Sequence, residues 1–66
     1  MGIDQAQPVA VRYSHDGADY YVTGSSGKAK AFSMQKAMKV QLEVATIKGN
    51  AELVQYDQVP EELRHG

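Results

Sequence analysis

The sequence predicts an α+β domain: a three-stranded antiparallel sheet in the strand order 2-1-3, with one helix packed on one face. Three observations support this prediction. Two alternating strand patterns flank an Asp-Gly turn, one helix pattern has caps at both ends, and a third short strand pattern follows the helix. A chain of 66 residues has room for one domain. We expect a flexible lead over residues 1–8, the β-β-α-β domain over residues 9–57 and a polar acidic tail over residues 58–66.

The turn between the first two strands predicts how they pair. Asp16 and Gly17 form the dipeptide that favours a type I′ hairpin with a two-residue loop. Such a loop places Tyr13 opposite Tyr20, and a shift of one residue would move every apolar side chain to the wrong face. The face that we expect to meet the helix carries the alternate apolar residues Val9, Val11, Tyr13, Tyr20 and Val22.

A helix is predicted over residues 33–48. Ser33 is a suitable N-cap, and Gly49 provides a left-handed stop. At about 100° per residue, the apolar side chains cover about 220° of the helix circumference, whereas a surface helix shows a stripe a little over about 100° wide. We therefore expect either that the small sheet wraps the helix or that one edge of the helix, with Val40 and Ile47, contacts another chain.

The third strand is predicted over residues 52–56, beside the first strand and antiparallel to it. Apolar residues occupy both alternating sets of positions in this segment, so its orientation is ambiguous. We expect Val54 and Tyr56 to face the helix. In the opposite orientation, Tyr56 would join Tyr21 and Arg12 on an open face of the sheet, like the aromatic platform of sheet-based RNA-binding domains.

The composition excludes several classes of protein. The chain has no cysteine, and therefore neither a disulfide framework nor a thiolate zinc site. No apolar run approaches the roughly 20 residues of a membrane-spanning helix, and the first residues lack the basic and apolar regions of a secretory signal. We expect a cytoplasmic protein without membrane contact, whose small core gains stability from self-association.

No motif that carries catalysis or binds a cofactor is predicted. Residues 24–28 (GSSGK) have two residues between the glycines, where a Walker loop has four, and Ala29 stands where that loop has Ser or Thr. His15, Asp16 and Asp19 lie on one hairpin, where the Asp-Gly pair serves the geometry of the turn. We expect a non-enzymatic protein with no catalytic residue, no metal and no cofactor.

The net charge of −1 conceals an uneven distribution. Residues 24–50 hold five lysines against one glutamate, and the segments on both sides are acidic. A charge run is most often a solvated face, but lysines near a helix N-terminus also attract anions. The candidate anion or nucleic-acid contacts are Lys28, Lys30, Lys36 and Lys39.

The stretches VAVRYS, DGADYYV, KAFSMQKAM and GNAELVQYD together resemble small β-β-α-β domains of bacteria and their phages, whose function is uncharacterised. In those domains a hairpin with a glycine turn precedes one helix and a strand that begins "aelv". The resemblance covers residues 9–57. It implies the same architecture and assigns no functional residue.

Two functions from different classes follow from these patterns. The first is a small non-enzymatic protein-interaction module that forms a homodimer, docks on a larger partner or does both, such as a phage-type accessory factor or an inhibitor of a host protein. Its candidate contacts are Val40, Ile47, Arg12 and Tyr21. The alternative is a weak nucleic-acid-binding protein that uses the lysine-rich segment 28–39 and Tyr21. Nucleic-acid domains typically have a pI above about 9, and this chain has a pI of about 6.0, so the sequence favours protein interaction.

Overall fold

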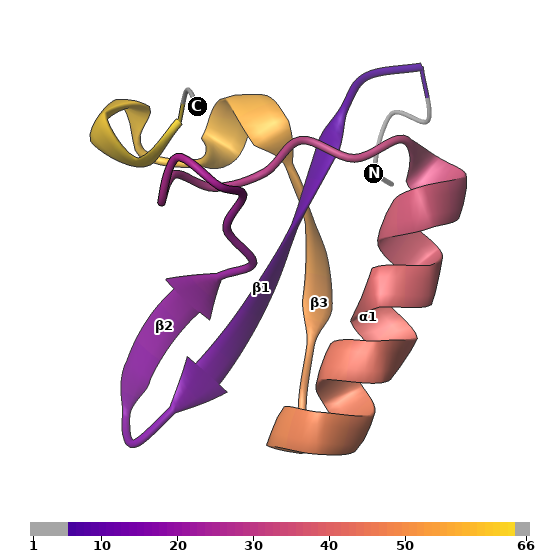
Figure 1. Ribbon diagram of the computed structural model, residues 1–66, viewed down its shortest axis with the longest axis vertical. Coiled ribbons are helices and arrows are strands. Elements are labelled where there is room, and N and C mark those ends of the chain that lie inside the picture. Colours follow the sequence, from indigo (N-terminus) through magenta and orange to yellow (C-terminus); the bar gives the residue numbers. More distant parts are fainter. Residues whose placement is uncertain (1–5, 65–66) are drawn as a thin grey trace.

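The computed structural model describes residues 6–64 and has the predicted architecture. Three antiparallel strands form one sheet in the order β2-β1-β3, and a single helix packs across β1 and β3 (Figure 1). Two short 3₁₀ turns follow β3 and make up most of the C-terminal segment, residues 56–64. The elements in chain order are β1 (Val9–His15), β2 (Ala18–Tyr21), α1 (Met34–Lys48), β3 (Glu52–Gln55) and the 3₁₀ turns Tyr56–Gln58 and Glu61–Leu63.

The hairpin has the predicted turn and the predicted register. Asp16 and Gly17 have φ angles of 52° and 80°, the pair of positive values that a type I′ turn requires. Tyr13 lies opposite Tyr20, and their rings stack with centroids 5.6 Å apart. The prediction that these two tyrosines share one face of the sheet is confirmed.

The predicted helix caps are also confirmed. The Ser33 hydroxyl accepts a hydrogen bond from the Lys36 backbone N–H at 3.4 Å, and Ser33 has extended backbone, as an N-cap does. At the other end, Gly49 has a φ of 89°, and its N–H donates to the Ala45 carbonyl at 2.8 Å. A residue with a Cβ is strained in this left-handed conformation, which explains glycine at this position.

The larger apolar core lies between α1 and the sheet. Val9 and Val11 of β1 are completely buried there, together with Ala37 of α1. Phe32 is buried beside them, and its backbone exchanges two hydrogen bonds with Val9, so the segment before α1 continues the line of β2 along β1. The partly buried residues around this core are Val22, Met34, Val40, Val44, Ala51 and Leu53.

The expectation that Val54 and Tyr56 face the helix is wrong. Val11 pairs with Leu53 in the antiparallel ladder, and residues directly opposite each other point to the same side, so Leu53 packs in the helix-side core. Val54 pairs with Ala10 on the other face. The alternation of β3 was uninformative because both faces of this sheet are covered, and a strand covered on both faces has apolar residues at consecutive positions.

Two polar contacts fix this register of β3. Arg12 lies directly opposite Glu52, and its Nε donates to Glu52 Oε2 at 2.6 Å. One step further along, the Asn50 side chain takes the place of a strand partner for Ser14. It accepts the Ser14 N–H at 2.8 Å and donates to the Ser14 carbonyl at 3.0 Å. The end of α1 and the start of β3 are thereby held at the end of β1.

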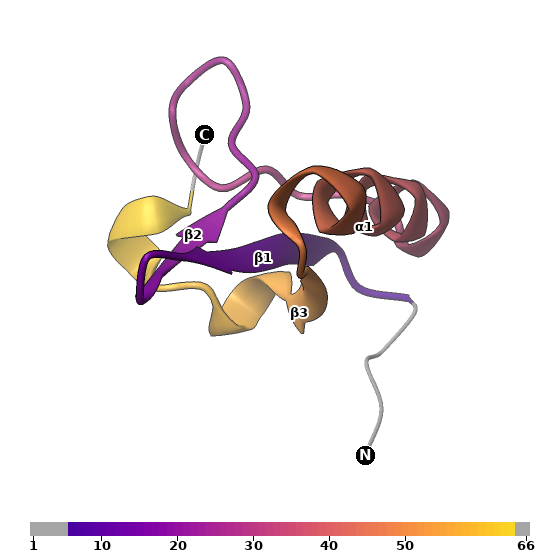
Figure 2. The same cartoon turned by 90° about the horizontal axis from the view of Figure 1, so that it is seen from below.

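The opposite face of the sheet is covered by the C-terminal segment. Val59 is buried against Ala10 of β1 and Ala29 of the crossover, and Tyr21 and Tyr56 pack around them. The Ala29 N–H donates to the Leu63 carbonyl at 2.7 Å, which ties this segment to the crossover. In Figure 2 the 3₁₀ turns lie below the sheet and α1 above it. The sequence pattern predicted a polar acidic tail over residues 58–66, and within that stretch Val59 is buried.

We predict that Val59→Ala lowers the free energy of unfolding by roughly 1–3 kcal/mol, because a buried side chain is truncated in a small cluster. Urea denaturation measures this loss. Gln58→Ala is the matched control, since Gln58 is the exposed neighbour in the same turn, and should change stability by less than about 0.5 kcal/mol. Equal stability of Val59→Ala and the wild type would show that the C-terminal segment does not contribute to the core.

Candidate functional site

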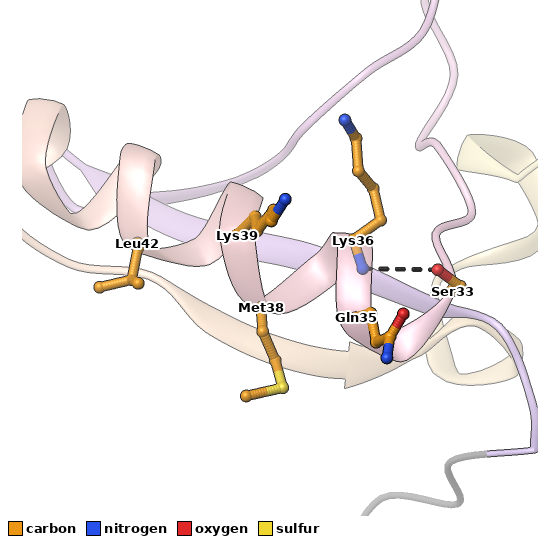
Figure 3. A pocket seen from close by; sticks show the side chains of 6 residues that line it. All are labelled: Ser33, Gln35, Lys36, Met38, Lys39 and Leu42. Carbon is orange, nitrogen blue, oxygen red and sulfur yellow. Dashed lines mark hydrogen bonds between the residues drawn. The ribbon is translucent and has the colours of Figure 1, made fainter.

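Two of the exposed apolar side chains of α1, Met38 and Leu42, lie on one side of the helix (Figure 3). Met38 is 53% exposed and Leu42 is 71% exposed, one helical turn apart. Ala37, immediately before Met38 in sequence, is completely buried. Because Ala37 is small, the helix lies close to β1 at this point. The larger side chains of Met38 and Leu42 lie outside the contact between the helix and the sheet. The two exposed residues therefore form a surface that the domain does not use for its own core.

These two side chains lie in an open groove of about 600 Å³. All the lining residues come from α1 and its N-cap, so the groove has walls from one helix only and suits a flat or helical partner better than an enclosed small molecule. Figure 3 shows Met38 and Leu42 pointing to one side of the helix, while the Lys36 side chain extends away from them. We call this surface the outer helix face; it consists of Ser33, Gln35, Lys36, Met38, Lys39 and Leu42.

The outer helix face carries charges that are available to a partner. Lys36 and Lys39 line the groove, and Glu43 follows Lys39 by one turn. None of these three side chains takes part in an ion pair with another of the described residues. Charges in solvent beside exposed apolar side chains are typical of the rim of a protein–protein interface.

A second and smaller groove of about 270 Å³ lies between the C-terminal half of α1 and β2. Ile47 is 76% exposed at this groove, and the Lys48 Nζ lies 5.7 Å from the centre of the Tyr13 ring. Tyr20 stacks on Tyr13 and is 44% exposed. The groove is lined by Tyr13, Tyr21, Val22, Thr23, Val44, Ile47 and Lys48.

Of the four predicted partner contacts, only Ile47 and Tyr21 line a common groove, the smaller one. Ile47 is exposed, whereas Val40 packs against the helix-side core. Tyr21 lines the smaller groove but is half-buried, and it packs against the cluster around Val59. Arg12 binds Glu52 across the sheet, and this hydrogen bond raises the pKa of the Arg12 guanidinium above its ordinary value, so the side chain stays charged. No cation–π contact between Arg12 and Tyr21 is present among the described residues.

The predicted anion or nucleic-acid contacts are also dispersed. Lys28 donates from its Nζ to the Glu62 carbonyl at 2.8 Å. The Lys30 Nζ lies 5.6 Å from the centre of the Phe32 ring. Lys36 and Lys39 are on α1. The crossover that carries the first two lysines is a closed turn, in which Thr23 and Ala29 form a bridge. The four lysines therefore do not line one groove.

The described residues include no group of three or more His, Cys, Asp or Glu side chains that could hold a metal ion. On the hairpin, the His15 Nε2 lies 3.4 Å from the Asp16 Oδ2, and both side chains are exposed. Over the same part of the chain, no helix is long and apolar enough to cross a membrane.

The sequence pattern indicated a surplus of apolar surface on the helix, and the structure exposes Ile47 as well as a pair that was not selected. Val40 and Ile47 were selected, whereas the adjacent exposed residues are Met38 and Leu42. The position of Ala37 was the available signal, because a small residue in the middle of the apolar arc marks where a helix approaches its sheet most closely.

Comparison with protein-family models, with curated proteins and with solved structures finds no match to this chain.

We predict that Leu42→Gln changes the free energy of unfolding by less than about 0.5 kcal/mol, because an exposed helical leucine contributes little to the core. Val11→Ala should cost roughly 1–3 kcal/mol in the same thermal or urea unfolding experiment, since Val11 is completely buried. If Leu42→Gln destabilised the protein as much as Val11→Ala does, the outer helix face would be part of the core.

Proposed function

We propose that this chain is a non-enzymatic, cytoplasmic protein-interaction module that recognises another protein through its outer helix face. The observation that carries the proposal is the exposure of Met38 and Leu42 at one edge of a capped helix that is fixed to the sheet on its opposite side. Adjacent apolar side chains on a rigid element bind a partner without a further loss of backbone freedom.

The surroundings of the two residues support this function. Lys39 and Lys36 border the groove and can form charged contacts at the rim, while the apolar pair occupies the centre. Methionine adapts to partners of different shape because its side chain is flexible and polarizable. An interaction surface with an apolar centre and a charged rim is the usual arrangement in protein–protein complexes.

Nucleic-acid binding receives less support from the same observations. Lys28 and Lys30 are on the crossover, Lys36 and Lys39 are on α1, and Tyr21 packs around Val59 instead of lying on an open sheet face. Binding a nucleic-acid backbone needs a continuous basic groove, and stacking of bases needs an accessible ring.

Affinity capture from the native lysate tests the proposal. Immobilised wild-type protein is compared with the double variant Met38→Gln, Leu42→Gln, and with Leu63→Gln as a matched control that removes an exposed leucine on the C-terminal segment. We expect specific proteins to be captured by the wild type and by the control, and to be lost with the double variant.

Capture that is equal for the wild type and the double variant would contradict the assignment of the interaction to the outer helix face. A further variant, Ile47→Gln, identifies the surface in that event. Loss of capture in Ile47→Gln alone would assign the interaction to the smaller groove beside β2.

We also predict no binding to duplex DNA or single-stranded RNA tighter than tens of micromolar at physiological salt. If all four lysines contacted phosphates, the log–log slope of affinity against salt on duplex DNA would be about −3.6. Fluorescence anisotropy with labelled oligonucleotides measures both quantities. A sub-micromolar complex that weakens when Lys28, Lys30 and Lys36 are changed to alanine would overturn the choice of protein as the partner.

A further inference from the structure

The outer helix face carries a pattern that is complementary to itself. Along α1, with Met34 at zero, Met38, Leu42 and Gln35 lie at about 40°, 80° and 100°. Lys39 and Glu43 lie on one flank of this stripe, at about 140° and 180°. The stripe thus has an apolar centre and, along one side, a positive charge followed one turn later by a negative charge.

This pattern fits a contact between two copies of the chain around a twofold axis. In an antiparallel helix pair the same flank of each helix faces the other copy, and residues on opposite sides of the axis meet. The twofold axis lies between the two helices, at the height midway between Val40 and Gln41. It brings Met38 beside Leu42 of the second copy, and Lys39 beside Glu43 of the second copy. With a rise of about 1.5 Å per residue, the two residues of each pair lie within about 1.5 Å of each other along the helix axis.

We infer that the occupant of the outer helix face is a second copy of this chain, packed antiparallel through α1; this inference rests on the proposed function. The register that joins the apolar side chains also joins opposite charges, twice in each dimer. Lys39 and Glu43 form no ion pair with other described residues, so both are available for this contact.

The dimer is weak, because the contact is confined to one helix of 15 residues. Its length is about 22 Å at the standard helical rise. Interfaces that bury less than about 1,200 Å² in total are typical of transient complexes. We expect a dissociation constant in the micromolar range or weaker, so the protein is a monomer when dilute and a dimer when concentrated.

Sedimentation velocity from low micromolar to millimolar protein concentration tests the inference. The average mass of the wild type should rise towards that of a dimer, and Leu42→Gln should shift this rise to higher concentration. Lys39→Glu and Glu43→Lys should each weaken association roughly fivefold to thirtyfold, because each places like charges together in both symmetric pairs. Lys30→Glu is the matched control, with the same change in charge on an exposed lysine of the crossover, outside the outer helix face.

An equal mixture of Lys39→Glu and Glu43→Lys gives the decisive result. In a mixed dimer every pair at the two positions is again opposite in charge, so the mixture should associate more strongly than either variant alone. An effect within a single helix cannot produce this recovery, since each chain in the mixture keeps its own substitution. Far-UV circular dichroism checks that both variants remain folded.

Wild-type protein that stays a monomer at millimolar concentration would overturn the inference, as would a mixture no stronger than its components. Either result leaves the proposed function standing if proteins from the lysate still require Met38 and Leu42 for capture. If proteins from the lysate were captured equally well without Met38 and Leu42 while the dimer still formed, the proposed function would be overturned and the dimer would stand.

Discussion

The structure depends on the burial of β1 from both sides. Val9, Ala10 and Val11 are consecutive and completely buried, although their side chains alternate between the two faces of the sheet. α1 covers Val9 and Val11, and the C-terminal segment covers Ala10 through Val59. A domain of this size buries only about 60% of the surface that its unfolded chain exposes, so it needs both covers to make a core from such short strands. Because Ala10 is small, the C-terminal segment, which has only short 3₁₀ turns, can approach the sheet closely.

The same constraint explains which apolar residues remain at the surface. The helix turns Ala37, Val40 and Val44 towards β1, and the turn around Gly49 then directs the chain back into β3 beside β1. A sheet of three strands is too narrow to cover the full apolar arc of α1. Met38 and Leu42 lie beyond one side of the contact, and Ile47 lies near its other side. Apolar side chains that the fold leaves exposed on a rigid helix are the physical basis of the proposed interaction.

The parts of the fold that could be predicted from the sequence are those set by local chemistry. Asp16-Gly17 determines a turn and, with it, the pairing of Tyr13 with Tyr20. Ser33 and Gly49 determine the ends of the helix for similar local reasons. The orientation of β3 could not be predicted, because residues 52–56 are apolar in both alternating sets and both faces of the sheet are covered. The anchoring of Val59 and the exposure of Met38 depend on contacts between distant segments, which no local pattern records.

Native-state amide hydrogen exchange tests most directly whether the burial of β1 organises the domain. The decisive amides donate to carbonyls around β1: Val9 to Phe32 at 2.9 Å, Phe32 to Val9 at 2.8 Å and Val22 to Val11 at 2.9 Å. We expect these amides to exchange only through global unfolding, with a free energy equal to that from urea denaturation, while those in the helix exchange no more slowly. Protection that persists in α1 after the amides around β1 have exchanged would contradict the account, because the helix would then be stable without the strand on which it packs.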